Sequence, residues 1–325
     1  MLNRPRRLRQ NCAIREMVQE SSLRLNEMIY PMFVTSQKGA LEPILSLDGH
    51  YRYGPDRLIE EIGALFEKHG IQSFALFPHF PESLKDRDGK LATDGQNFYL
   101  QTICDLKARY PDIVIMGDVA LDPYSSDGHD GLVDTDSGEI INDETVEILA
   151  RMACLQASAG VDIIGPSDMM DGRVKSIRQA LERNGHQQTI IMSYCAKYAS
   201  SFYGPFRQAL ESAPKNGDKK SYQMDFANSR EALREAQLDI EEGADILLVK
   251  PALAYLDIIY QFNQNFHLPV AAYQVSGEYA MIDSMAKQGH ASREQLALEC
   301  LTSIKRAGAK IILSYFTKDL AQYLR

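Results

Sequence analysis

The sequence predicts a (β/α)8 barrel, in which eight parallel strands alternate with helices, preceded by an extended N-terminal arm. Short apolar runs stand at regular intervals, and amphipathic segments separate most of them, an alternation typical of parallel sheets. In one run, Ile246 to Val249, four apolar residues follow one another. A strand with one face in water would alternate apolar and polar residues, so this one is predicted to be buried on both faces. An open doubly wound sheet is the alternative, but no G-x-G-x-x-G motif follows the first strand and no Walker A loop occurs.

The domain organisation follows from where this alternation begins. We assign residues 1–35 to an arm that contacts other subunits and residues 36–325 to a single barrel domain, although Met28 to Val34 has the composition of a strand entry. Within the barrel, we expect the eight strands near residues 73, 114, 162, 190, 222, 246, 270 and 311. We expect helices over residues 58–69, 96–109, 143–159, 173–184, 229–242, 254–265 and 292–307.

Local signals support the ends of several helices. Gly70, Gly160, Gly243 and Gly308 each follow an amphipathic segment, where a glycine commonly ends a helix. Ser292 stands three residues before Gln295, a spacing that predicts a capping box at a helix start.

Composition and charge limit the class of protein. The chain has 325 residues, of which 45% are apolar and 24% charged, as in an ordinary globular protein. Its net charge of −9 argues against general binding of nucleic acids. Arginines 4, 6, 7 and 9 are an exception, and we interpret them as part of a solvated or subunit-packing arm.

The same features indicate a reducing, aqueous compartment. No apolar run approaches the roughly 18 residues of a membrane helix, and no signal peptide is recognisable. The five cysteines are scattered and form no C-x-x-C pair, which favours reduced thiols over disulfides or a cysteine zinc site. We therefore expect a cytoplasmic protein.

Polar residues occupy the positions where the predicted strands end. In a (β/α)8 barrel the carboxyl ends of the strands carry the active site. The polar residues at or just after these ends are Asp118, Ser167, Lys197, Gln223, Lys250, Ser276 and Tyr315.

Two of these residues, Lys197 and Lys250, are lysines at the ends of apolar strands. Burial and a neighbouring cation both lower the pKa of an amine, so two facing lysines would each help to deprotonate the other. A neutral amine attacks a ketone or aldehyde and forms a Schiff base, which acts as an electron sink. The alternative is that each lysine forms a salt bridge with a carboxylate at the barrel rim.

Longer motifs resemble one enzyme family over residues 25 to 325, the porphobilinogen synthase (5-aminolaevulinate dehydratase) family. They occur in one order along the chain, at residues 118–124, 128–131, 166–173, 196–200, 202–207, 222–225, 249–252, 275–278 and 305–308. The resemblance implies a lyase of tetrapyrrole (haem) biosynthesis that condenses two molecules of 5-aminolaevulinate into porphobilinogen with loss of two waters.

The resemblance also assigns expected roles to individual residues. It implies that Lys250 forms the Schiff base with the substrate of the P-site and Lys197 with that of the A-site. For the P-site carboxylate it implies two hydroxyl donors, and for the A-site carboxylate three donors. These are Ser276 and Tyr315 at the P-site, and Arg207, Lys219 and Gln223 at the A-site. Three further residues line the site by resemblance, Asp118, Ser167 and Tyr203, and Lys219 with Lys220 are expected on a lid loop.

The metal expectations depend on a departure from the family pattern. Relatives that use zinc carry three cysteines where this chain has Ala120, Asp122 and Asp130, so it resembles the aspartate-type branch without a cysteine zinc site. Carboxylates suit hard cations, and Asp122 and Asp130 would hold Mg²⁺, K⁺ or only water; a mobile, solvated loop is the alternative. His129 keeps its place in the motif, whereas Asp127 replaces a histidine.

A second metal site and an assembly are implied elsewhere. Glu235 matches the glutamate that binds an allosteric Mg²⁺ in relatives, with Asp168 and Asp171 as possible partners through water. The family commonly forms homo-octamers in which the arm wraps a neighbouring subunit. Two other functions stay open on the residues alone: an aldolase that uses one lysine, and a non-enzymatic protein that binds a ligand or scaffolds an assembly.

Overall fold

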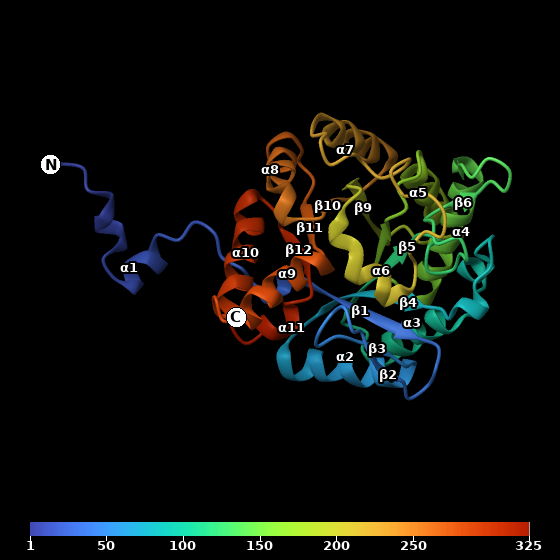
Figure 1. Cartoon of the computed structure of the whole chain (residues 1–325), viewed down its shortest axis with the longest axis horizontal. Helices are drawn as coiled ribbons and strands as arrows, with labels where there is room; N and C mark the ends of the chain where they lie inside the picture. The colour runs from blue at the N-terminus through green and yellow to red at the C-terminus, as the bar shows by residue number, and fades with distance from the viewer. Residues whose placement is uncertain (325) are drawn as a thin grey trace.

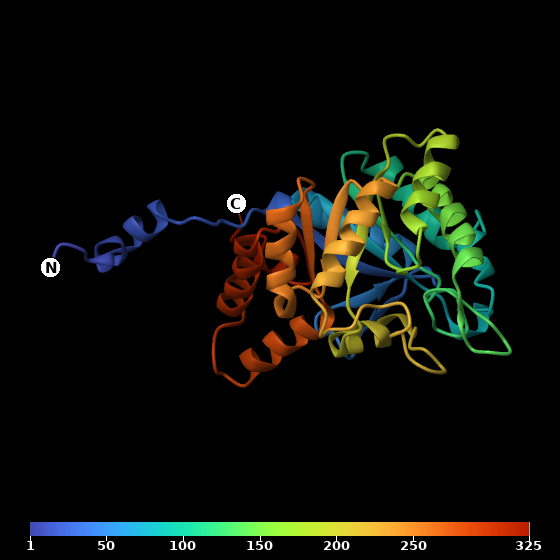
Figure 2. The ribbon, with the colours of Figure 1, turned by 90° about the horizontal axis from the view of Figure 1, so that it is seen from above.

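The computed structural model describes residues 1–324 and has a closed barrel at its centre (Figure 1, Figure 2). Eight parallel strands form it in the order β1, β4, β5, β8, β9, β10, β11, β12, and β12 pairs with β1 to close the ring. The predicted fold class is confirmed. The strands are β1 (Met28–Thr35), β4 (Ser73–His79), β5 (Val114–Val119), β8 (Ile163–Pro166), β9 (Ile190–Lys197), β10 (Ile246–Lys250), β11 (Val270–Gln274) and β12 (Ile311–Ser314).

Helices pack around the barrel wall, and seven of them coincide with the predicted segments (Figure 1). Gly70, Gly160 and Gly243 adopt positive φ values of 73°, 104° and 106° at the helix ends, a conformation that a glycine reaches without steric cost. The Ser292 side chain accepts a hydrogen bond from the Gln295 backbone N–H, as the capping spacing predicts. These helices are α2 (Pro55–His69), α3 (Phe98–Arg109), α4 (Asn142–Ala159), α5 (Arg173–Arg183), α7 (Arg230–Glu242), α8 (Leu256–Asn265) and α10 (Arg293–Ala307).

One predicted barrel strand is wrong. Residues 222–224 form a turn, in which the Gln223 N–H donates to the Lys219 carbonyl, and only an isolated bridge joins Met224 to Tyr198. The missing strand is β1, whose eight residues are all buried between β4 and β12. The arm therefore ends before Met28. The arm predicted over residues 1–35 wrongly includes β1, which belongs to the barrel.

Four helices were not predicted: α1 (Cys12–Met17), α6 (Gly204–Leu210), α9 (Ser276–Lys287) and α11 (Thr317–Leu320). Two of them follow barrel strands at the end that carries the lysines, α6 after β9 and α9 directly after β11. Helix α6 has seven residues, too few for a clear periodic pattern, and the Ser276–Gly277 pair that begins α9 suggested a loop. The short pairs β2 (Leu41–Pro43) with β3 (Tyr51–Tyr53), and β6 (Leu132–Val133) with β7 (Ile140–Ile141), lie in connections.

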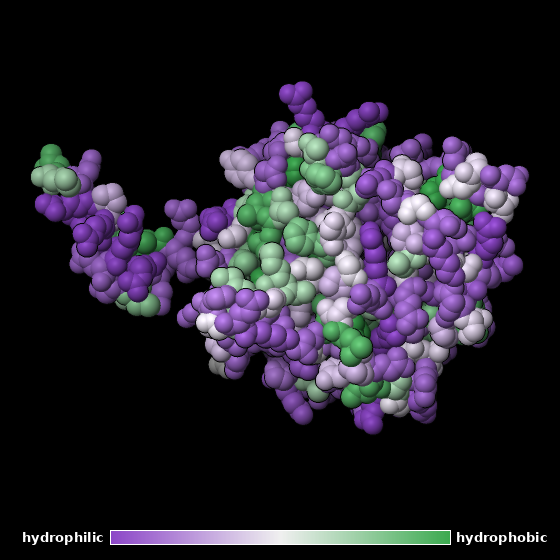
Figure 3. Space-filling view, viewed as in Figure 1, coloured by the Kyte–Doolittle hydropathy of each residue, from purple (hydrophilic) through white to green (hydrophobic). Residues whose placement is uncertain are grey.

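The first part of the arm extends away from the barrel (Figure 2). Its residues up to Met17 are almost all exposed, and they include the apolar side chains of Leu8 and Met17. Figure 3 shows apolar residues gathered on the barrel face next to the arm, over α8, α9 and α10. Among residues 1–324, every helix is too short or too polar to cross a lipid bilayer.

Candidate active site

Lys197 and Lys250 end two neighbouring strands and are paired in register, so their side chains leave the barrel side by side. Both are buried, with 6% and 5% of their surfaces exposed. They share one polar cavity at the carboxyl ends of the strands. Its other lining residues come from strand β5, from loops, from the short 3-10 turn before α6 and from α6 itself: Asp118, Asp122, Asp130, Ser167, Tyr203, Phe206, Arg207, Lys219 and Gln223.

Lys250 lies among aromatic rings and forms no ion pair within the described residues. Its Nζ atom is 4.8 Å from the centroid of the Tyr273 ring and 5.0 Å from that of Phe206, with Tyr194 and Tyr203 slightly farther away. Burial and the adjacent Lys197 lower the pKa of Lys250 to about 7, against the weaker opposing effect of the nearby carboxylates. Ring faces attract a cation, but only by about 0.5–2 kcal/mol, and the loss of hydration outweighs this. A large fraction of Lys250 is therefore a neutral amine near pH 7.

Asp118, on β5, is a carboxyl group with an unusual protonation equilibrium. It is buried, and its Oδ1 atom has no hydrogen-bond partner among the described residues. Burial raises the pKa of Asp118 to about 7, although the neighbouring Lys250 ammonium favours the carboxylate. A carboxyl group that titrates near neutral pH can both give and accept a proton, which is what general acid–base chemistry requires.

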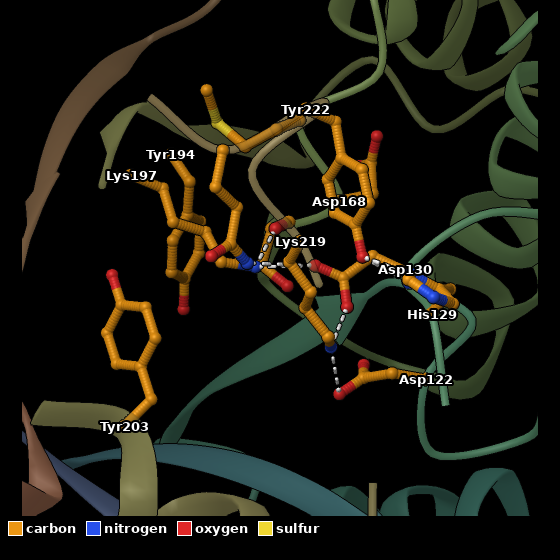
Figure 4. Close-up of polar contacts among 12 residues, drawn as sticks. Asp122, His129, Asp130, Asp168, Tyr194, Lys197, Tyr203, Lys219 and Tyr222 are labelled. Carbon is orange, nitrogen blue, oxygen red and sulfur yellow. Dashed lines mark hydrogen bonds and ion pairs between the residues drawn. The ribbon is translucent and has the colours of Figure 1, made fainter. Parts of the chain in front are cut away.

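Lys197 is in a different electrostatic setting from Lys250 (Figure 4). Its Nζ atom lies 2.9 Å from Asp130 Oδ2 and also donates to the Ser167 carbonyl. The second Asp130 oxygen, Oδ1, lies 2.6 Å from Lys219 Nζ, which is 3.4 Å from Asp122 Oδ2. Asp130, with 1% of its surface exposed, therefore joins two lysines in one buried network.

Tyr222 and His129 hold Asp130 in place from its backbone side (Figure 4). The Asp130 N–H donates to the Tyr222 hydroxyl at 3.3 Å, and the His129 Nδ1 atom lies 3.1 Å from the same hydroxyl. His129 Nε2 lies 2.9 Å from the Asn216 carbonyl, which can only accept, so this nitrogen carries a proton. Burial alone would raise the pKa of Asp130, but the Lys197 and Lys219 ammonium groups hold it well below its ordinary value.

Two expectations from the sequence need correction here. The expectation of two neutral amines is supported for Lys250 alone, because Lys197 forms an ion pair with Asp130. The alternative of a solvated aspartate loop is wrong, because Asp122 and Asp130 are buried. Their carboxylates accept hydrogen bonds from the buried ammonium groups of Lys197 and Lys219.

Two of the three residues expected to bind the A-site carboxylate, Arg207 and Gln223, also lie at this cavity. Arg207, on α6, is half-buried and stacks its guanidinium 6.0 Å from the centroid of the Tyr203 ring, while the Tyr203 hydroxyl donates to the Lys250 carbonyl. Gln223 Nε2 lies 3.4 Å from Asp130 Oδ2. Of the expected lid lysines, Lys219 points into the cavity, whereas Lys220 is exposed and pairs with Asp218.

Ser276 and Tyr315 lie next to the lysine cavity but do not line it. Ser276 begins α9, and its hydroxyl accepts a hydrogen bond from the Phe206 N–H at 3.0 Å. The Tyr315 hydroxyl lies 3.1 Å from that of Tyr273, whose ring faces Lys250. Both are buried and reach Lys250 through one aromatic neighbour each.

The expected allosteric metal residues lie outside this cavity. Glu235, on α7, is half-buried and forms no hydrogen bond or ion pair with the described residues. Burial raises its pKa, Arg173 opposes this, and Asp239 and Asp171 raise it further. Asp168 is fully buried with its Oδ2 atom unpartnered, while Asp171 is exposed. Among residues 1–324, no three His, Cys, Asp or Glu side chains converge as a metal-binding group.

Sequence reasoning missed the aromatic residues around Lys250, namely Tyr194, Phe206 and Tyr273. Tyr194 and Tyr273 stand inside strand runs, where an aromatic residue is most often core, and Phe206 stands in a helix that was not predicted. The sequence pattern places Tyr222 in a strand, whereas in the structure it lies in a turn and positions Asp130. No local signal separates these residues from ordinary packing residues.

Comparisons with known proteins agree on one family. The model of the family described as "Delta-aminolevulinic acid dehydratase" matches residues 2–323. The chloroplastic delta-aminolevulinic acid dehydratase of Glycine max is 51% identical over 99% of this chain and 77% of its own length. The Chlamydia pneumoniae enzyme of the same name is 48% identical over 99% of this chain and 96% of its own length.

A solved structure has the same fold throughout. It is delta-aminolevulinic acid dehydratase (porphobilinogen synthase) from Toxoplasma gondii, in complex with the reaction product porphobilinogen. It superimposes with a TM-score of 0.97 at 46% identity, covering 99% of this chain and 92% of that one.

The lowered pKa of Lys250 predicts selective chemistry at neutral pH. We expect reductive alkylation by a small ketone to modify Lys250 half-maximally near pH 7, because the neutral fraction of an amine rises as the pH passes its pKa. Lys287, an exposed lysine whose pKa is raised by Asp283 and Asp48, serves as the control and reacts only at more alkaline pH. Peptide mass spectrometry after labelling at a series of pH values measures both; equal pH profiles would contradict the prediction.

The Asp130 network predicts a large stability loss on neutralisation. Asp130→Asn leaves the Lys197 and Lys219 ammonium groups buried without their shared counter-charge, so we expect the free energy of unfolding to fall by about 3 kcal/mol. Asp127→Asn is the matched control, since Asp127 pairs only with the exposed Arg87 and its loss costs at most about 1 kcal/mol. Urea unfolding at pH 7 measures the difference, and similar losses in the two variants would contradict the network.

Proposed function

Because the chain belongs to the delta-aminolevulinic acid dehydratase family, it condenses two molecules of 5-aminolaevulinate into porphobilinogen, and we propose that Lys250 and Lys197 capture the two substrates. The reaction loses two waters and belongs to porphyrin biosynthesis. The observation that carries the assignment of residues is the in-register pair of buried lysines, one of which has a pKa near 7 and no carboxylate partner among the described residues.

Lys250 is the amine prepared to react in the substrate-free chain. Its neutral nitrogen attacks the ketone carbon of one substrate. The oxygen takes one proton from that nitrogen and a second from the protonated fraction of Asp118, leaves as water, and an iminium remains beside the Asp118 carboxylate. That iminium withdraws electrons from the adjacent carbon and makes it acidic. Asp118, which titrates near pH 7 in the same cavity, is the group that we assign to proton transfer there.

Lys197 must exchange partners before it reacts. The substrate carries a carboxylate, and Arg207, Lys219 and Gln223 gather beside Lys197 as donors for it. Asp130 accepts hydrogen bonds from Lys197, Lys219 and Gln223. Its carboxylate thus occupies donors that we assign to the carboxylate of the substrate. We assign Ser276 and Tyr315, together with the aromatic wall, to the carboxylate of the substrate on Lys250.

The donor set argues against a tight catalytic metal, and we place the chain in the aspartate-type branch. Ala120, Asp122 and Asp130 supply no thiolate for zinc. The oxygens of Asp122 and Asp130 that would bind Mg²⁺ or K⁺ already accept from lysines, so a cation would have to displace Lys219. Lys219 therefore supplies the positive charge at this position.

Glu235 does fit a hydrated Mg²⁺. It is a half-buried carboxylate without a protein partner among the described residues. Burial and nearby acids raise its pKa, and a bound cation would offset both the lost hydration and the repulsion between the acids. Asp168 and Asp171 would then contact the bound ion through water. The ion would supply positive charge that holds these acidic groups together.

The arm suggests how subunits assemble. Its exposed apolar residues and the apolar barrel face in Figure 3 support packing of the arm on a neighbouring subunit. We propose a homo-octamer for this assembly, a number that comes from the family resemblance. The chain's own barrel, from β1 onward, forms the catalytic domain. All five cysteines are unpaired thiols, which supports a reducing compartment such as the cytoplasm.

Turnover of 5-aminolaevulinate tests the roles of the two lysines. We expect Lys250→Ala to abolish porphobilinogen formation, measured colorimetrically, because the covalent anchor is lost while the burial of an amine is relieved. Borohydride reduction in the presence of substrate should modify both Lys197 and Lys250 in the unaltered chain. An aldolase that uses one lysine would trap at one position only, and absence of pyrrole from folded protein would remove the enzymatic assignment.

Metal removal tests the cofactor proposal. We expect turnover to persist in EDTA, because the only proposed ion lies outside the cavity. Addition of Mg²⁺ should raise turnover, and Glu235→Gln should abolish this stimulation because it removes the carboxylate that binds the ion. Glu231→Gln, on the exposed first turn of the same helix, is the control. Sizing by analytical ultracentrifugation with and without Mg²⁺ reports the assembly, and complete loss of turnover in EDTA would contradict the proposal.

A further inference from the structure

Helix α6 is short, yet it supplies two walls of the substrate cavity. Phe206 faces Lys250 and Arg207 lines the cavity beside Lys197. The backbone N–H of Phe206 also donates to Ser276. A helix of seven residues is not stable by itself, so contacts with the rest of the chain must determine where α6 lies.

Two cationic side chains hold the C-terminal end of α6. Arg52, on β3, donates from Nε to the Ala209 carbonyl at 2.6 Å and from a terminal nitrogen to the Gln208 carbonyl at 2.9 Å. Lys85, in the loop after β4, donates to the carbonyls of Leu210 and Glu211, the latter at 2.9 Å. The last carbonyls of a helix have no intrahelical partners, and cations there also complement the helix dipole.

Glu211 adds side-chain contacts between the C-terminal end of α6 and the barrel. It is the C-cap of the helix and adopts a φ of 50°, a left-handed conformation that a residue with a side chain rarely takes. Its carboxylate lies 3.2 Å from Arg52 and 3.6 Å from His79 Nε2 on β4. Such a conformation persists where surrounding contacts determine it, and here those contacts are Arg52 on the Glu211 carboxylate and Lys85 on the Glu211 carbonyl.

Lys85 has no role in the proposed chemistry that would explain its burial. It is 9% exposed, and within the described residues its Nζ atom contacts only the two carbonyls at the end of α6. At the other end of the helix, the Ser46 hydroxyl donates to the Pro205 carbonyl. Side chains from residues 46–85 therefore hold α6 at both ends.

We propose that Arg52 and Lys85 are positioning residues for substrate binding, and that they act by fixing α6 so that Arg207 and Phe206 face the cavity. The inference rests on the proposed function, because it takes Arg207 as a binder of the substrate carboxylate. Loss of either cation leaves carbonyls at the C-terminal end of α6 without their donors, while the contacts of the Phe206 ring with Phe33 and Phe77 remain. That end of the helix then loosens, and the guanidinium of Arg207 moves away from the place where the carboxylate binds.

Kinetics of matched variants test the proposal. We expect Arg52→Gln and Lys85→Gln to raise the KM for 5-aminolaevulinate by about tenfold or more, with a smaller change in kcat, because a displaced Arg207 loses a contact that binds the carboxylate equally in substrate and transition state. Arg52→Lys restores part of the loss. Arg57→Gln and Lys90→Gln, which change exposed residues that pair only with Glu60 and Asp88, leave KM unchanged.

A double variant tests whether Arg52 changes the KM through Arg207. If Arg52 acts through α6, Arg52→Gln adds much less to the KM of Arg207→Gln than it adds to that of the unaltered chain. Effects that multiply, or Arg52→Gln and Arg57→Gln chains with equal KM, would overturn the proposal. An unaltered chain that forms no porphobilinogen, or an Arg207→Gln chain with unchanged KM, would instead count against the proposed function.

Hydrogen exchange gives a second measurement that needs no turnover. Arg52→Gln should accelerate exchange of the amides in α6 while leaving those of α2 protected, since only α6 loses its carbonyl contacts. Unchanged exchange in α6 would overturn the proposed role of Arg52, whether or not the chain is active. Unfolding midpoints of all variants are compared first, so that global destabilisation is separated from local release.

Discussion

Lys250 is buried among four aromatic rings and forms no ion pair within residues 1–324, and this environment is what the rest of the site depends on. An amine deprived of water and of a carboxylate is stabilised in its neutral form, which is the form that attacks a ketone. The barrel produces this environment because β9, β10 and β11 are adjacent, so Tyr194 and Tyr273 flank the lysine on both sides. The same burial raises the pKa of Asp118 to about 7 and leaves a proton donor in the cavity.

The two lysines show how one residue type takes two electrostatic roles a few ångströms apart. They are in register on neighbouring strands, but the loop after β5 brings Asp130 to Lys197 and not to Lys250. The two lysines therefore differ because of one carboxylate: Lys197 forms an ion pair with Asp130, whereas Lys250 has no such partner and is ready to react. Lys219 shares that carboxylate, so the donors expected for a substrate carboxylate are already organised around an internal one.

The outer wall of the cavity is assembled from segments far apart in the chain. Helix α6 follows β9, and it is held by Arg52 and Lys85, which lie more than 120 residues earlier. The barrel supplies rigid strand ends, whereas α6 and the loop that carries Lys219 close over them. Residues that never touch substrate thus determine where Arg207 and Phe206 lie.

The sequence by itself determined the fold class, most helix boundaries and the two lysines. Those features follow from local properties: hydrophobic periodicity, glycines that end helices, and polar residues that interrupt apolar runs. The eighth strand was assigned to residues 222–224 instead of β1, because closure of a barrel depends on pairing between its first and last strands. Only the tertiary structure decided which lysine is neutral, since Asp130 lies 67 residues from Lys197 along the chain and beside it in space. A pKa depends on such distances and on burial, and the local sequence around a residue determines neither of them.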